Sequence, residues 1–137
     1  MAGRSARDVS VSRLVTPRVV TVEASDDAAL ALRLLVSDPT PGVIVCREGT
    51  PVGIVTLRDL GVVCAVHWPN LSASRLRAEQ IMSSPLIVVR PDATLAELAP
   101  LLMRADLECM AVVRDGKLMG VLERNRVLRT CLRMLTR

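Results

Sequence analysis

The sequence predicts an α+β fold built from one strand–helix–strand–strand–helix unit that occurs twice. Three observations lead to this prediction: an internal repeat, short apolar runs placed between helical patterns, and an aliphatic core. Half of the 137 residues are hydrophobic, yet the chain has no Tyr, no Phe and one Trp. A chain of this length can bury a substantial core or form two small lobes.

The internal repeat has a period of 67 residues. Shifting the chain by this amount lays residues 14–64 on residues 81–131 without a gap, and it pairs apolar with apolar positions and glycine with glycine. Gly53 falls on Gly120, and Cys64 on Cys131. Such self-similarity indicates a duplicated structural unit. We therefore divide the chain into a tail (1–11), a first repeat (12–66), a linker (67–77) and a second repeat (78–135).

Each repeat begins with a strand that follows a proline turn at Pro17 or Pro85. A helix, a two-stranded hairpin and a closing helix follow, and the dipeptides Glu48-Gly49 and Asp115-Gly116 are typical of hairpin turns. The expected strands are Val19–Val22, Val43–Cys46, Val52–Val55, Leu86–Val89, Met110–Val113 and Leu118–Leu122. The expected closing helices are Leu57–Val66 and Arg124–Leu135, and the second of these carries one apolar stripe.

The first helix of each repeat has an expected start and, in the second repeat, an expected defect. Ser25 and Asp92 are predicted as N-caps, and Asp26 and Asp27 are predicted to place negative charge in the opening turn. Pro100 falls within the corresponding helix of the second repeat, where it removes a hydrogen-bond donor or kinks the helix.

The junction between the third strand and the closing helix of the first repeat allows two interpretations. Thr56 follows an apolar run, and Asp59 lies three residues further on. In the first interpretation, Thr56 and Asp59 form a capping box at the start of the helix. In the second, helix N–H groups and the Thr56 hydroxyl bind a phosphate, and Asp59 accepts hydrogen bonds from ribose hydroxyls. The local sequence does not separate them.

In combination, these motifs resemble the cystathionine-β-synthase (CBS) domain pair, or Bateman module. The resemblance rests on residues 15–22 (VTPRVVTV), 53–60 (GIVTLRDL), 81–85 (IMSSP) and 89–95 (VRPDATL), and it covers about Ser12 to Leu135. It implies tandem repeats related by a pseudo-two-fold axis, two clefts between the sheets, and modules that pair into a flat disc.

The resemblance further implies a ligand that contains adenine: AMP, ADP, ATP or S-adenosylmethionine. Asp59 would hold the ribose and Thr56 the phosphate, with Arg58 as a further phosphate-binding group. The remaining expected ligand-binding residues, which would wall the adenine, are Pro17, Arg18, Val19, Val43 and Ile44.

The second repeat departs from this pattern, because the 67-residue shift places Glu123 on Thr56 and Arg126 on Asp59. A carboxylate repels phosphate, and a guanidinium group cannot accept a hydrogen bond. We therefore expect one competent site. Arg124 and Arg126 could instead contact the phosphate in the first cleft, or they could be solvated side chains beside a degenerate site.

Composition argues against several other classes of protein. The net charge of +4 comes from scattered arginines, and the near absence of aromatic residues removes base stacking, so we do not expect nucleic-acid binding. No apolar run has the ~20 residues of a membrane span, and residues 1–12 are polar, which favours a cytoplasmic protein without a signal peptide.

We expect free thiols at the four cysteines, although Cys64 and Cys131 lie on helices that face an interface in the resembled family. With only His67 as a nitrogen ligand and no nucleophile–base pair or Walker loop, we expect neither a metal site nor an enzyme.

Two functions rank first after these exclusions, and nucleic-acid binding through the arginines ranks third, below both. The first is a regulatory module that binds an adenine nucleotide and acts on an effector protein as partner. The second is a structural homodimer whose ligand sites are vestigial and whose Thr56 and Asp59 only cap a helix. The many aliphatic residues favour self-association in either case.

Overall fold

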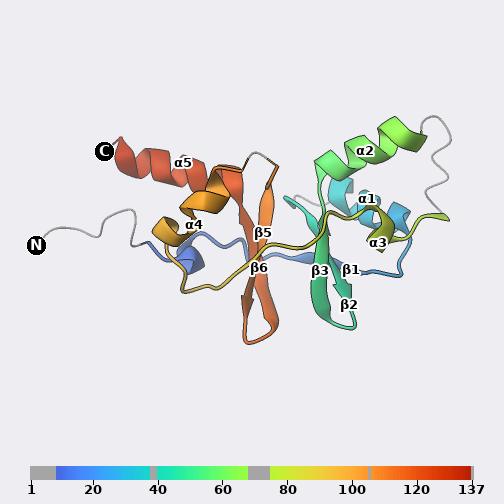
Figure 1. The fold of residues 1–137 in the computed structure, drawn as a ribbon, viewed down its shortest axis with the longest axis horizontal. Coiled ribbons are helices and arrows are strands. Elements are labelled where there is room, and N and C mark those ends of the chain that lie inside the picture. Colours follow the sequence, from blue (N-terminus) through green and yellow to red (C-terminus); the bar gives the residue numbers. More distant parts are fainter. Residues whose placement is uncertain (1–8, 38–39, 68–74, 105, 137) are drawn as a thin grey trace, which may run out of the picture. The chain divides into compact units, whose positions relative to one another are not determined.

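The structure is a computed structural model, and it describes residues 9–37, 40–67, 75–104 and 106–136. The chain divides into two compact units (Figure 1). The first unit is Arg18–Ile87, and the second combines residues 9–17 with residues 88–136. Most of the expected tail (1–8) and of the expected linker (68–74) lies outside the described residues.

The first unit contains a three-stranded sheet in the order β1-β2-β3, with β1 parallel and β3 antiparallel to β2. Its elements are β1 (Val20–Glu23), α1 (Ala28–Ser37), β2 (Val43–Arg47), β3 (Thr50–Val55), α2 (Leu57–His67) and α3 (Ala78–Ile81). Its core is aliphatic, as the composition predicts: Val22, Val43, Val45 and Val55 of the sheet pack with Ala31 and other apolar side chains of the helices.

The second unit repeats this topology in a sheet of order β4-β5-β6, again with one parallel and one antiparallel pair. Its elements are a 3₁₀ helix η2 (Val11–Arg13), β4 (Val88–Val89), α4 (Leu95–Leu102), β5 (Cys109–Arg114), β6 (Lys117–Glu123) and α5 (Arg124–Leu135). The predicted α+β class and the duplicated unit are thereby confirmed.

Both hairpin turns also form as predicted. Glu48 and Gly49 have φ of 51° and 80°, and Asp115 and Gly116 have φ of 50° and 76°. Two successive residues in the left-handed region produce the turn that matches the right-handed twist of paired strands. Glycine takes the second place in each turn because it adopts this conformation without steric cost.

The predicted starts of the first helices are wrong. Helix α1 begins at Ala28, three residues after Ser25, and it has no acidic residue in its first turn. Asp26 instead accepts a hydrogen bond from the N–H of Glu23 (2.8 Å) and so closes a turn after β1. In the second unit the cap is Thr94, whose hydroxyl accepts from the N–H of Glu97 (3.4 Å), and not Asp92. Pro100 lies inside α4, which ends two residues later at Leu102.

The boundaries of the two units differ from those of the two sequence repeats. Each unit is completed by a short segment that precedes the strands of the other repeat, and we call these the lead-in segments. Residues 9–17 join the second unit, where Val11 donates to the carbonyl of Ala93 (2.8 Å). Residues 78–87 join the first unit, where Ala78 donates to the carbonyl of Asp26 (2.8 Å). The repeats therefore exchange their lead-in segments.

Candidate functional site

The candidate site lies where β3 of the first unit passes into α2. The apolar strand ends at Val55 and the helix begins at Leu57, so Thr56 occupies the junction. Thr56 and Asp59 are the buried polar residues of the part of the chain that the structure describes, with exposed fractions of 6% and 8%. A buried carboxylate requires hydrogen-bond partners, and their identity decides what the site can do.

Three donors satisfy the Asp59 carboxylate. Its Oδ2 accepts from the backbone N–H of Thr56 (2.7 Å) and from the Thr56 hydroxyl (3.1 Å). Its Oδ1 accepts from the hydroxyl of Ser83 (2.7 Å). The bond to the Thr56 N–H is the reciprocal half of the capping box that the sequence predicts. The Thr56 hydroxyl, however, donates to the carboxylate, whereas in a complete capping box it would accept a hydrogen bond from a backbone N–H. The interpretation of Thr56 and Asp59 as ligand-binding side chains therefore stays open.

Ser83 is the residue of this site that the sequence analysis missed. It lies on the lead-in segment, and its backbone forms two hydrogen bonds with Ile54 of β3 (2.8 and 3.1 Å). The segment passes so close to β3 that a Cβ on Gly53 would meet the sulfur of Met82. The 67-residue shift pairs Ser83 with Thr16, and a hydroxyl at both positions is the signal that could have identified it.

The other predicted ligand residues of the first repeat lie in different surroundings. Val43 and Ile44 begin β2 and are fully buried, whereas Arg58 is exposed on the first turn of α2. Pro17 and Arg18 are exposed and Val19 is half-buried. The lead-in segment before them pairs with the second unit, because Thr16 forms two backbone hydrogen bonds with Val121 (2.9 and 3.0 Å). The hydrogen bonds of Asp59 bring it together with Thr56 and Ser83.

At the equivalent junction of the second unit, a positively charged hydrogen-bond donor takes the place of the carboxylate acceptor. A terminal nitrogen of Arg126, Nη1, donates to the hydroxyl of Thr16 (2.7 Å). Arg124 donates through Nε to the carbonyl of Leu102 at the end of α4 (2.8 Å). Both arginines that were expected as phosphate contacts thus bind groups of their own unit. The bond of Arg124 satisfies a carbonyl at the end of α4.

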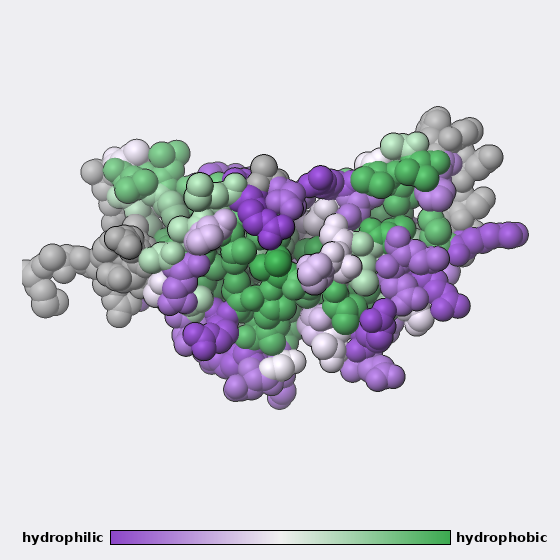
Figure 2. Space-filling model, in the orientation of Figure 1, coloured by the Kyte–Doolittle hydropathy of each residue, from purple (hydrophilic) through white to green (hydrophobic). Residues whose placement is uncertain are grey.

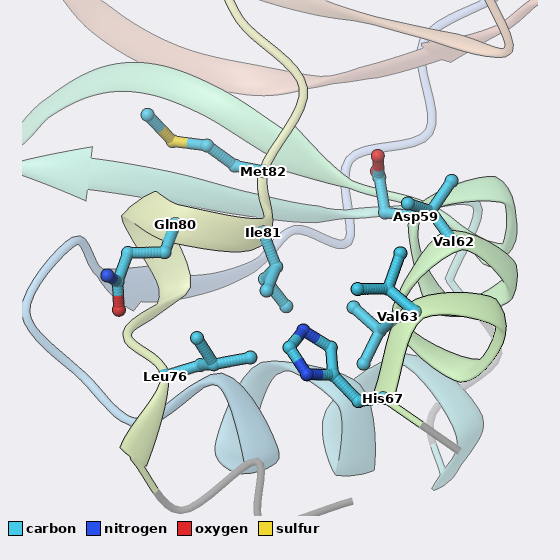
Figure 3. A pocket seen from close by; sticks show the side chains of 9 residues that line it. Asp59, Val62, Val63, His67, Leu76, Gln80, Ile81 and Met82 are labelled. Carbon is cyan, nitrogen blue, oxygen red and sulfur yellow. The ribbon is translucent and has the colours of Figure 1, made fainter.

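A pocket of about 310 Å³ opens between α2 and α3 of the first unit, and Asp59 lies at its edge (Figure 3). The side chains of Val63, Leu76 and Ile81 surround His67, whereas the carboxylate of Asp59 points away from that ring. Besides these apolar side chains, the polar side chains of His67 and Gln80 line the pocket.

The described residues contain no group of three or more His, Cys, Asp or Glu side chains that could hold a metal ion. None of the described helices has the length and apolar character that crossing a membrane requires. All four cysteines are free thiols. Burial, followed by the charges of Glu123 and Glu108, raises the pKa of the Cys109 thiol to about 12, so this thiol is an inert core group at neutral pH.

Comparisons with known proteins agree with the repeat. A protein-family model described as the CBS domain matches residues 11–60 and 78–133. The chain is similar to the crystal structure of CBSX2 in complex with AMP, with 30% identity, coverage of 92% of this chain and 98% of that chain, and a TM-score of 0.72. It is also similar to CBSX2 from Arabidopsis thaliana, with 29% identity, coverage of 93% and 97%, and a TM-score of 0.71.

A curated relative is the uncharacterized protein MJ1404 of Methanocaldococcus jannaschii, which is 30% identical over 132 residues. The match covers 86% of this chain, and the chain spans only 31% of the length of that relative.

Proposed function

Because this chain belongs to the CBS domain family, we propose that it is a regulatory module that binds an adenine nucleotide and acts on an effector protein. In this proposal the first unit holds one competent site. The ligand-binding residues are Thr56, Arg58 and Asp59, with the adenine walled by segments that include Pro17, Arg18, Val19, Val43 and Ile44. Arg124 and Arg126 are further proposed phosphate contacts.

The observation that carries this proposal is the buried carboxylate of Asp59 at the start of α2. An ionised carboxylate can accept hydrogen bonds from both hydroxyls of a ribose. The helix N-terminus beside it favours a phosphate. The similarity to CBSX2, whose structure contains AMP, favours an adenine nucleotide over other ligands with a ribose. The proposed ligand is AMP, ADP, ATP or S-adenosylmethionine, bound as a signal and not as a cofactor for catalysis.

A second candidate function is a structural homodimer, and a different observation favours it. Three apolar side chains on α2 are exposed: Leu57 (63%), Val62 (56%) and Val66 (68%). Leu132 (60%) and Leu135 (76%) are exposed on α5, and Figure 2 shows apolar surface over both helices. Exposed apolar helix faces are typical of association surfaces. Self-association is compatible with either function, so only ligand binding separates the two.

A thermal-shift panel tests the first proposal. The purified protein is heated alone and with AMP, ADP, ATP or S-adenosylmethionine, with GTP as a control. A ligand present at about 100 times its dissociation constant adds about 2.7 kcal/mol to the stability of the native state. We expect one adenine compound to raise the melting temperature by several degrees.

The variant Asp59→Asn makes the test specific. Its amide oxygen can accept the two bonds from Thr56, and its NH₂ group can donate to Ser83, so the cap is retained without the charge. The matched control is Asp92→Asn, an exposed carboxylate of the second unit. Loss of the ligand shift in Asp59→Asn alone supports the nucleotide site. No shift with any adenine compound favours the structural dimer, which light scattering would detect directly.

A further inference from the structure

The hydrogen bonds of Asp59 leave little room for a ribose. A carboxylate has about four lone-pair positions. Three donors already occupy three of these positions: the N–H and the hydroxyl of Thr56 on Oδ2, and the hydroxyl of Ser83 on Oδ1. One position therefore remains for a ligand, whereas the two adjacent hydroxyls of a ribose need two. If both are to bind Asp59, one of the present donors must leave.

The three donors differ in what their departure would cost. The N–H of Thr56 is a backbone group at the start of a helix, and the Thr56 side chain is buried (6% exposed). Either of them would lose its partner in a place that water reaches poorly, which is unfavourable. Ser83 is exposed, so its hydroxyl can turn to water at little cost. Ser83 is therefore the donor that can yield.

The backbone of Ser83 does not need to move for this exchange. Its N–H and its carbonyl are both paired with Ile54, and Gly53 allows the lead-in segment to lie against β3. Rotation about one side-chain bond is sufficient to release Oδ1, because a serine hydroxyl has three staggered positions. The exchange is thus local to the site.

We propose that Ser83 is a specificity-determining residue of the ribose site, whose hydroxyl occupies Oδ1 of Asp59 in the empty site and yields to the second hydroxyl of a ribose. This inference rests on the proposed nucleotide-binding function. A ligand with a single hydroxyl uses the free position of the carboxylate and leaves Ser83 in place. A ligand with two hydroxyls gains its second hydrogen bond only by exchange. Ser83 therefore reduces the preference of the site for ribose over deoxyribose.

The test is the affinity of Ser83→Ala for AMP and for 2′-deoxy-AMP, measured by isothermal titration calorimetry. Without the Ser83 hydroxyl, the second ribose hydroxyl adds a bond to a charged acceptor instead of replacing one. We expect AMP to bind about tenfold more tightly, since a net hydrogen bond to a charged group corresponds to about that factor. The affinity for 2′-deoxy-AMP should change less than about twofold, so the ratio of the two dissociation constants should rise about tenfold.

Two variants serve as controls. Ser84→Ala removes the neighbouring exposed hydroxyl and should match the wild type. Ser83→Thr keeps a hydroxyl at the position, as Thr16 does in the second unit, and should also keep the wild-type ratio. Thermal melting of each variant without ligand establishes that it is folded.

The remaining outcomes would overturn the inference. If Ser83→Ala keeps the wild-type ratio, Ser83 does not compete with the ribose. If Ser83→Ala binds AMP more weakly, Ser83 assists the ligand and does not yield to it. In both cases the wild type binds AMP and the Asp59→Asn variant does not, so the proposed function would stand. If the wild type binds no adenine nucleotide, both the function and this inference are wrong.

Discussion

The two strand–helix junctions have the same backbone arrangement and opposite chemistry. In the first unit, Asp59 accepts a hydrogen bond from Ser83 on the lead-in segment (2.7 Å). In the second unit, Arg126 donates a hydrogen bond to Thr16 on the other lead-in segment (2.7 Å). A hydroxyl group can donate or accept, so it satisfies either partner.

This difference shows that the backbone arrangement of the junction does not depend on which charged side chain it carries. Paired backbone hydrogen bonds join each lead-in segment to its third strand, at Ile54 or at Val121. The backbone arrangement therefore survives the replacement of an acceptor by a donor, whereas the proposed contact with a ribose requires the acceptor. The comparison makes four predictions, which follow in order of decreasing effect, with the pH effect counted per pH unit.

The largest effect is expected from a methyl group added where the lead-in segment approaches the strand. In Gly120→Ala the new Cβ would meet the backbone oxygen of Thr16, whereas in Gly53→Ala its nearest neighbours are in the flexible Met82 side chain, with the backbone oxygen of Ser83 at 3.0 Å. We expect losses of unfolding free energy of about 3 kcal/mol for Gly120→Ala and about 1 kcal/mol for Gly53→Ala. Urea unfolding followed by circular dichroism measures both. Equal losses would mean that the two approaches are equivalent.

The second largest difference between the two junctions is expected when the charged side chain of each is removed. Asp59→Ala leaves the N–H and hydroxyl of Thr56 without their buried partner, so we expect a loss of about 2 kcal/mol. Arg126→Ala removes one bond from an exposed side chain, and we expect a loss below about 0.5 kcal/mol. Chemical denaturation of the proteins without ligand is the measurement. A costly Arg126→Ala would show that the second junction also depends on its charged group.

Alkaline pH should destabilise the second unit through Cys109. Below about pH 9, the ordinary thiol value, the native and unfolded states both keep the proton. Between pH 9 and 12 the unfolded chain loses it while the native state retains it, because burial raises the pKa of Cys109 to about 12. The free energy of unfolding should fall by about 1.4 kcal/mol per pH unit in this window. Cys109→Ala should remove this contribution, and an unchanged slope would contradict the assignment.

The smallest effect concerns the helix caps. Thr94→Ala should cost about 0.5–1 kcal/mol, because the Thr94 hydroxyl accepts from the N–H of Glu97 at the start of α4. Ser25→Ala, at the cap position that the sequence predicts for the first unit, should have no measurable effect, since α1 begins at Ala28. Thermal unfolding of both variants distinguishes them. A loss in Ser25→Ala alone would restore the sequence-based position.

The sequence was informative where a local pattern has one structural solution. The dipeptides Glu48-Gly49 and Asp115-Gly116 require left-handed turns, and the hairpins form around them as predicted. Helices α2 and α5 were predicted to within one residue, because each follows an apolar strand directly and carries a periodic pattern. The caps of α1 and α4 were mispredicted because Ser, Thr and Asp suit turns as well as caps, and Asp26 forms a turn after β1.

The candidate site was only partly predictable, for a reason of topology. Thr56 and Asp59 share one helical turn, so their spacing identifies them. Ser83 is 24 residues from Asp59, on a segment that belongs to the second repeat in sequence and to the first unit in space. An internal repeat establishes that two segments are equivalent, but it does not determine the copy on which each of them packs.

The exchange of lead-in segments also has an evolutionary reading. An ancestral polypeptide of one repeat would have lacked a lead-in segment packed on its own sheet, and it could have received one from an identical neighbour. Gene duplication would then have joined two such chains and preserved the exchange as a covalent connection. A single repeat cut from this protein, such as residues 12–66, would carry a lead-in segment for a sheet that it does not contain.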